Sequence, residues 1–128
     1  MNPLTRLWRS TIGQKVLMAL SGIIGIGFVI VHMVGNLQIF EGPAKLNGYS
    51  HVLHGPLNEL LWIARVVLLV AVVVHVVMAY RLTLRNRAAR PIAYQVREPQ
   101  VSTCAARTLR WGGVLLLIFI PLHILNIT

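Results

Sequence analysis

Residues 57–80 read LNELLWIARVVLLVAVVVHVVMAY, an apolar block that only a few ionisable side chains interrupt. A helix needs about 20 mainly apolar residues to cross roughly 30 Å of hydrocarbon, because each residue adds about 1.5 Å. This block is long enough, and two more blocks, at about 16–40 and 111–128, qualify or nearly do so. The sequence therefore predicts an all-α fold, a transmembrane helical bundle with three helices in a single domain over residues 1–128.

The composition excludes an ordinary water-soluble domain. Apolar residues make up 56% of the chain, charged residues only 12%, and the mean hydropathy is +0.72. The formal net charge of +9 would point to nucleic acid in a soluble protein. Here the basic residues gather between the apolar blocks, where they orient a chain in a membrane, so we expect lipid contacts and no nucleic acid.

Basic residues predict the orientation of the chain. Three precede the first block, one (Lys45) lies in the first loop, and seven lie in the 81–110 stretch. By the positive-inside rule the N-terminus and the second loop are cytoplasmic. The glycines and prolines of the first loop, about 41–56, predict irregular edges with room for one short helix between them.

The first and third apolar blocks indicate what we expect near the two ends of the sequence. The first block is longer than a signal-peptide core and no A-x-A site follows, so we expect it to be retained. The third block is still apolar at its end, LHILNIT, so the bundle is expected to continue beyond it. Cys104 alone builds no disulfide or metal cluster and is expected to be an inert thiol.

Three histidines fall inside the apolar blocks, namely His32, His75 and His123. Ionisable side chains inside a membrane are costly, so each is a candidate functional residue. For any one of them, a hydrogen bond to a neighbouring helix is the simpler explanation. Their joint placement favours a shared role.

The depth of each histidine follows from its distance to the basic flanks. His32 and His123 lie about 25 Å and 20 Å beyond the basic residues that precede their blocks, whereas His75 lies only about 9 Å before Arg81. A haem held by two histidines needs neutral imidazoles from different helices at equal depth. His32 and His123 therefore suit an outer haem, and His75 suits one face of an inner haem whose other ligand lies outside this chain.

Other residues in the apolar blocks are candidates for contact with a haem. Gly22, Gly25, Gly27 and Gly35 in the first block let either a porphyrin or a neighbouring helix approach closely, and the two possibilities stay open. Arg65 lies inside the second block and needs an anion. A haem propionate is favoured over Glu59, because residues six positions apart on a helix do not face each other.

Titratable groups near the outer face are candidates for quinone chemistry. Glu59 and His54, with His51 and Glu41, would exchange protons with a quinone beside the outer haem. For each of them a solvated loop side chain is the favoured alternative. No residue is expected to be catalytic in its own right.

Several motifs together resemble one known family. They are Ser10–Lys15 (STIGQK) leading into Ala19–Gly22 (ALSG), Phe28-x3-His32-x3-Asn36-Leu37, Asn47-Gly48-Tyr49, Leu61–Arg65 (LWIAR) with His75, and Arg107–Gly113 (RTLRWGG) with His123. The chain is similar in these stretches to the cytochrome b558 family, the haem-carrying membrane anchors of succinate dehydrogenase and fumarate reductase. The motifs span nearly all of the chain.

The resemblance implies a five-helix bundle that holds two b haems in the bacterial inner (cytoplasmic) membrane. It implies that His32 and His123 ligate the distal haem iron and that His75 ligates the proximal one. It also implies flavoprotein and iron–sulfur subunits on the cytoplasmic side, which oxidise succinate and pass electrons through this chain to menaquinone or ubiquinone. Succinate chemistry would occur on the flavoprotein, since no nucleotide or dicarboxylate motif is visible here.

The chain departs from that family because helices four and five and the fourth histidine are absent. The sequence is partial or split, or another membrane chain completes the bundle, or the second haem is missing. Pro121, two residues before His123, is also expected to kink the third helix. The alternatives are a cytochrome b subunit of a hydrogenase or formate dehydrogenase, and a haem-free anchor or transporter whose histidines relay protons.

Overall fold

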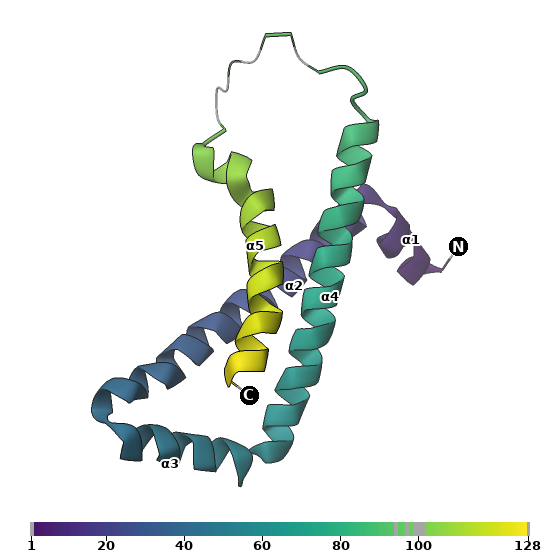
Figure 1. Cartoon of the computed structure of the whole chain (residues 1–128). Coiled ribbons are helices and arrows are strands. Elements are labelled where there is room, and N and C mark those ends of the chain that lie inside the picture. Colours follow the sequence, from purple (N-terminus) through teal and green to yellow (C-terminus); the bar gives the residue numbers. More distant parts are fainter. Residues whose placement is uncertain (1, 94, 97, 99–101, 128) are drawn as a thin grey trace. The chain divides into compact units, whose positions relative to one another are not determined.

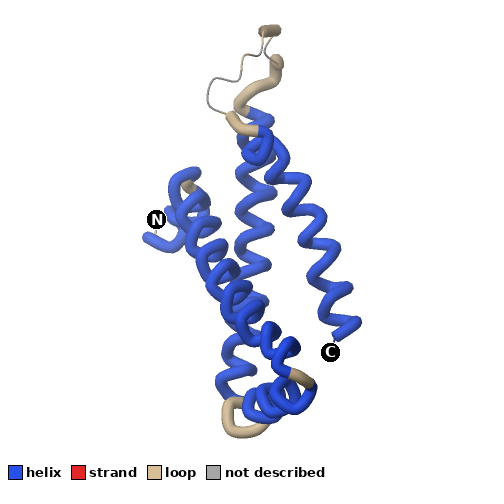
Figure 2. The backbone as a smooth tube through the Cα atoms, turned by 90° about the vertical axis from the view of Figure 1, so that its left-hand side faces the viewer, coloured by secondary structure: helices blue, strands red, loops and turns tan. Residues whose placement is uncertain are grey.

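The computed structural model of the chain describes residues 2–93, 95, 96, 98 and 102–127, and it contains helices and no strand in these residues (Figures 1 and 2). They fall into two compact units, Met1–Pro91 and Ile92–Thr128. Arg97, one of the seven basic residues of the 81–110 stretch, and Thr128, the last residue of the third apolar block, lie outside the described residues. The prediction of a single domain stays a prediction.

The first unit begins with a sharp corner between a short helix α1, Pro3–Arg9, and the long helix α2, Thr11–Asn36. Ser10 makes the corner because its hydroxyl accepts a hydrogen bond from the Gly13 amide at 2.9 Å and so caps α2. Gly13 has no side chain, and the Leu7 carbonyl occupies that space. Gln14 is fully buried and donates to the Trp8 carbonyl at 2.9 Å, which holds α1 against α2.

Two short helices connect the long ones. A 3-10 helix η1, Leu37–Glu41, follows α2, and helix α3, Pro43–His54, follows η1. Gly42 joins them with φ of 102°, a conformation that residues with a side chain rarely adopt. Gly35 is buried under the Tyr49 ring, so a methyl group there would lie 2.5 Å from the Tyr49 hydroxyl. This close approach fixes α3 across the end of α2.

Helix α4, Asn58–Ala88, returns along α2 and packs against it (Figure 1). Its buried stripe consists of Ala71, Met78 and Leu82, at helical spacing on one face. Arg85 extends the contact, because its guanidinium donates to the Arg9 carbonyl at 2.6 Å and to the Thr11 hydroxyl at 3.1 Å. The two long helices lie together near α1 and diverge toward α3.

The second unit contains helix α5, Cys104–Ile127. The Thr103 hydroxyl accepts a hydrogen bond from the Ala106 amide at 3.1 Å, which is the contact of an N-terminal cap. The helix continues through Pro121, and Cys104 is a free, exposed thiol at its start.

Three helices are long and apolar enough to span a membrane, over Thr11–Glu41, Asn58–Ala88 and Cys104–Asn126. In the most apolar stretch of each helix, 6%, 6% and 0% of the residues, respectively, are buried within the described part of the chain. Almost all of this apolar surface is therefore exposed. Water does not tolerate apolar surface on that scale, whereas lipid and neighbouring membrane helices cover it. The membrane character predicted from composition is thus reflected in the fold.

Most predicted helix ends differ from the observed ones, although the start at 57 lies one residue from Asn58 and the end at 128 lies outside the described residues. The expected helix at 16–40 begins at Thr11 and gives way to η1 after Asn36, and the one at 57–80 runs on to Ala88. The one at 111–128 begins at Cys104. Hydropathy marks where a chain crosses hydrocarbon, but a helix begins at its cap and continues through charged residues such as Arg, which is a strong helix former.

Candidate functional site

His75 is the candidate ligand that contacts the neighbouring long helix of the first unit. It lies on the α4 face that packs against α2, and its Nδ1 atom is 3.0 Å from the Met18 carbonyl oxygen and 3.2 Å from the Ser21 hydroxyl. Ser21 is itself buried and donates to the Leu17 and Met18 carbonyls at 2.8 and 3.0 Å. Helix α2 therefore holds the imidazole from one side.

The Met18 contact decides where the proton of the imidazole lies. A carbonyl oxygen only accepts hydrogen bonds, so Nδ1 must carry the proton and donate. In the neutral ring Nε2 then keeps its lone pair, and no residue of the described segments hydrogen-bonds to it. A ring nitrogen bonded to a backbone carbonyl, with the other nitrogen available, is the usual arrangement of a metal-ligating histidine.

The glycines of α2 serve two different purposes. A methyl group on Gly22 would lie 3.3 Å from His75 Cε1, so this glycine makes room for the imidazole. Gly35 does the same for Tyr49, and both therefore serve packing. Gly25 and Gly27 have no other atom within 4 Å of an added methyl group. At these two positions the predicted approach of a porphyrin stays a prediction.

His32 is held within its own helix. Its ring stacks on Phe28, with ring centroids 5.1 Å apart and an interplanar angle of 22°. Asn36 donates to the His32 carbonyl at 2.7 Å, and its amide nitrogen is also 3.5 Å from the ring Nδ1, which is too long to hold the ring. His32 is exposed and lies ten residues beyond the level of Gly22, about 15 Å along α2. His32 and His75 are thus at different levels.

His123 repeats this local arrangement in the second unit. Its ring stacks on Phe119 with centroids 5.1 Å apart and an interplanar angle of 26°. The i, i+4 spacing brings the two rings together on one face of α5. His32 and His123 belong to different units, so their predicted pairing on one iron stays a prediction.

Arg65 makes a contact that the sequence analysis did not anticipate. Its guanidinium carbon lies 4.9 Å from the centre of the Trp62 ring, which is a cation–π contact. Among the described residues the one ion pair joins Lys45 to Glu41 at 3.5 Å, so Arg65 forms none with Glu59 there. Arg65 is exposed, and its expected pairing with a propionate stays a prediction.

The proposed quinone residues lie at the corner between α3 and α4. His54 ends α3, and its Nδ1 donates to the Ser50 carbonyl at 2.9 Å. Glu59 lies in the first turn of α4. Both side chains, and those of His51 and Glu41, are exposed. Their positions fit solvated residues, and the quinone role is untested.

Three positioning residues were missed, although two had a readable signal. Phe119-x3-His123 repeats the spacing of Phe28-x3-His32, and Trp62 precedes Arg65 by three residues, so both pairs share a helix face. Ser21 gave no such signal, because its contact with His75 depends on how α2 and α4 pack. No group of three or more His, Cys, Asp or Glu side chains in the described residues could hold a metal ion, whereas a bis-histidine haem needs only two.

Comparison of this chain with family models, with characterised proteins and with solved structures finds no match.

Proposed function

We propose that this chain is a haem b membrane anchor of a succinate:quinone oxidoreductase, which passes electrons from an iron–sulfur subunit to a membrane quinone. The observation that carries the proposal is the arrangement of His75. It is an imidazole in a helix that is long and apolar enough to span a membrane. The hydrogen bond to the Met18 carbonyl places the proton of the neutral ring on Nδ1, which leaves Nε2 available to a metal.

The other residues would fit a chain whose histidines hold haem. Haem b, when bound, supplies one-electron transfer. Methyl groups added at Gly25 and Gly27 would meet open space, and Gly25, three residues after Gly22, lies on the side of α2 that faces His75. The rings of His32 and His123 are each oriented by a stacked phenylalanine. A guanidinium such as that of Arg65 matches the carboxylate of a propionate in charge and shape.

The choice of partner proteins rests on the motif resemblance and on charge. Four arginines of the first unit, Arg81, Arg85, Arg87 and Arg90, follow the apolar part of α4 on the side where α1 lies. A basic surface there can dock an acidic face of an iron–sulfur subunit. The chain itself would bind and orient, and the oxidation of succinate would take place on the flavoprotein.

The test is the electron donor that reduces the isolated complex. The tagged chain is purified with its partners in mild detergent, and the b-type absorption is followed after adding succinate, formate or hydrogen. Reduction by succinate, with covalent flavin in the preparation, is the expected result. Reduction by formate or hydrogen would reassign the chain to another cytochrome b complex, and absence of any haem absorption would refute the proposal.

A further inference from the structure

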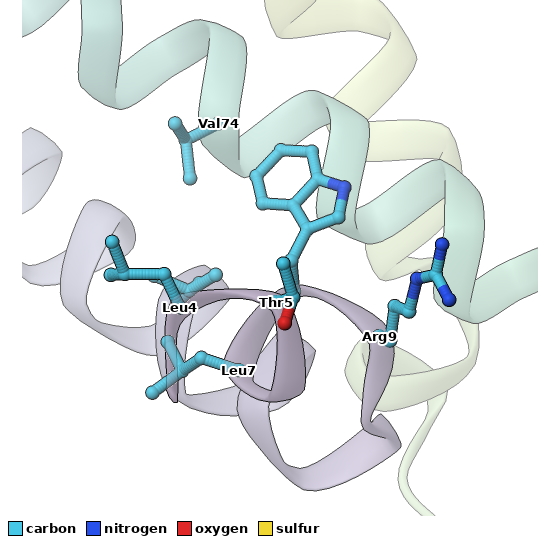
Figure 3. A pocket seen from close by; sticks show the side chains of 7 residues that line it. Leu4, Thr5, Leu7, Arg9 and Val74 are labelled. Carbon is cyan, nitrogen blue, oxygen red and sulfur yellow. The ribbon is translucent and has the colours of Figure 1, made fainter. Parts of the chain in front are cut away.

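The corner between α1 and α2 carries a feature that the electron-transfer role does not use. A groove of about 520 Å³ runs beneath α1, and we call it the α1 groove (Figure 3). Its apolar lining comes from three helices, with Leu4 and Leu7 from α1, Leu17 from α2 and Val74 from α4. The Trp8 ring completes it.

The groove reaches the apolar part of α4 and has a basic side chain at its edge. Val74 lies seven residues before Arg81, about 10 Å into the apolar part of α4. The lining surface of the groove is almost wholly apolar, and Arg9 lies at its edge, apart from Leu4 and Val74 in Figure 3. The groove therefore offers apolar surface at the depth of the hydrocarbon layer with a basic side chain at its rim, which matches the acyl chain and the headgroup of a phospholipid.

Within the first unit, the positive charge at the rim has no acidic partner. Arg9 is exposed, and the Arg81 guanidinium carbon lies 5.3 Å from the centre of the Trp8 ring. The chain has three acidic residues. Two of them, Glu41 and Glu59, adjoin the α3 end of the first unit, and the third, Glu98, belongs to the second unit. Within the first unit no carboxylate accompanies these arginines, so the rim attracts an anion.

Hydrogen bonds between the helices also fix the walls of the groove in the ligand-free chain. The Gln14 amide donates to the Trp8 carbonyl, and Arg85 donates to the Arg9 carbonyl, so the last turn of α1 is tied to both α2 and α4. The hydroxyl of Ser10 caps α2 at the same corner. A preformed groove loses less conformational entropy on binding than a flexible one.

We propose that the α1 groove binds one anionic phospholipid from the leaflet on the N-terminal side. An acyl chain lies against Leu4, Leu17 and Val74, and the phosphate is held at the rim by Arg9 and by the charge of Arg81. Apolar lining selects a lipid over a free anion, and arginines that have no carboxylate partner within the first unit select an anionic headgroup over a zwitterionic one. The proposal does not depend on haem.

The test is native mass spectrometry of the full chain, delipidated in neutral detergent with its accompanying partners. Phosphatidylglycerol and phosphatidylcholine with the same acyl chains are added in turn, and apparent dissociation constants are measured. Arg9→Gln is expected to weaken phosphatidylglycerol binding about fivefold, the effect of one basic residue near a lipid surface. Lys15→Gln is the matched control, because Lys15 is exposed at the same end but does not line the groove, and it should change binding less than about twofold.

A second variant tests the apolar part of the groove. Leu4 is 75% exposed, so Leu4→Gln should fold normally, as circular dichroism would verify, and should weaken the binding of both lipids. Equal binding of the two lipids, equal effects of Arg9→Gln and Lys15→Gln, or no effect of Leu4→Gln would each overturn the proposal. Displacement of phosphatidylglycerol by inorganic phosphate at equal concentration would show an anion site rather than a lipid site, and would also overturn it.

Discussion

At the level of single residues, the candidate histidines are held in two ways. His75 is fixed by hydrogen bonds from a neighbouring helix, whereas His32 and His123 are each stacked on a phenylalanine of their own helix. A hydrogen bond to Nδ1–H sets the tautomer and raises the basicity of Nε2, but a stacked ring only limits rotation. The electronic properties of an iron bound at His75 should therefore depend on α2.

Ser21→Ala tests this dependence. The substitution removes one of the two oxygen atoms near His75 Nδ1 and leaves the Met18 carbonyl. We expect haem to be retained with a loss of affinity of up to about tenfold, and a higher midpoint potential because the imidazole becomes a weaker donor. A potentiometric titration measures this. Ser50→Ala, which acts on His54 in α3, is the control and should leave the potential unchanged; equal potentials in all three proteins would remove Ser21 from the site.

A second residue-scale test concerns the close approach of Gly35 to Tyr49. Gly35→Ala should destabilise the protein by about 1–3 kcal/mol, because the new methyl group overlaps the phenol ring. In a Tyr49→Ala background most of that cost should disappear. Thermal unfolding in detergent measures both. Gly25→Ala is the control, since its methyl group meets no other atom within 4 Å; a similar loss there would show that the ring contact is not the cause.

At the level of helices, the sequence predicted which segments are long and apolar enough to cross a membrane, but not where most of the helices begin and end. Apolar composition alone located the three spans. Helix α1 escaped prediction because seven residues give too little periodicity, although Leu4, Leu7 and Trp8 share one face. The partner of His75 could not be predicted either. Met18 and His75 meet because of the register between α2 and α4, which arises from packing along the whole length of both helices.

The hydrogen bonds between the end of α4 and the corner of α1 and α2 can be tested with Arg85. Arg85→Ala removes two hydrogen bonds that tie the α4 end to Arg9 and Thr11. Because Arg85 is exposed, we expect a loss of only about 1 kcal/mol, which corresponds to roughly fivefold faster hydrogen exchange in α1. Mass-spectrometric hydrogen exchange measures it peptide by peptide. Arg87→Ala changes the same charge on the same helix and should not affect α1; equal acceleration by both would indicate a general charge effect.

At the level of the whole molecule, most of the apolar surface of the long helices faces outward. The buried apolar residues of the described segments are Ala71, Met78 and Leu82. So small a core does not stabilise a soluble fold of this length, and lipid or further helices must cover the remaining surface. The expected five-helix bundle agrees with this requirement but stays a prediction.

The orientation can be tested with the single native cysteine. The positive-inside rule predicts that Cys104 lies on the cytoplasmic side and that the α3 segment lies outside. In intact cells a membrane-impermeant maleimide should leave Cys104 unlabelled, and should label an Asn47→Cys variant in a Cys104→Ser background. Both positions are exposed, so access to the reagent decides the result. Labelling of Cys104 from outside would reverse the orientation.

The proposal that this chain carries haem b depends most on His75. The decisive measurement is a dithionite-reduced minus oxidised spectrum of the purified complex, with haem quantified per copy of the chain, in the wild type and in His75→Ala, with His54→Ala as control. We predict a b-type spectrum that loses haem in His75→Ala and is unchanged in His54→Ala. A wild-type complex without haem, or a His75→Ala variant that retains the full wild-type haem content and spectrum, would contradict the proposed role of His75.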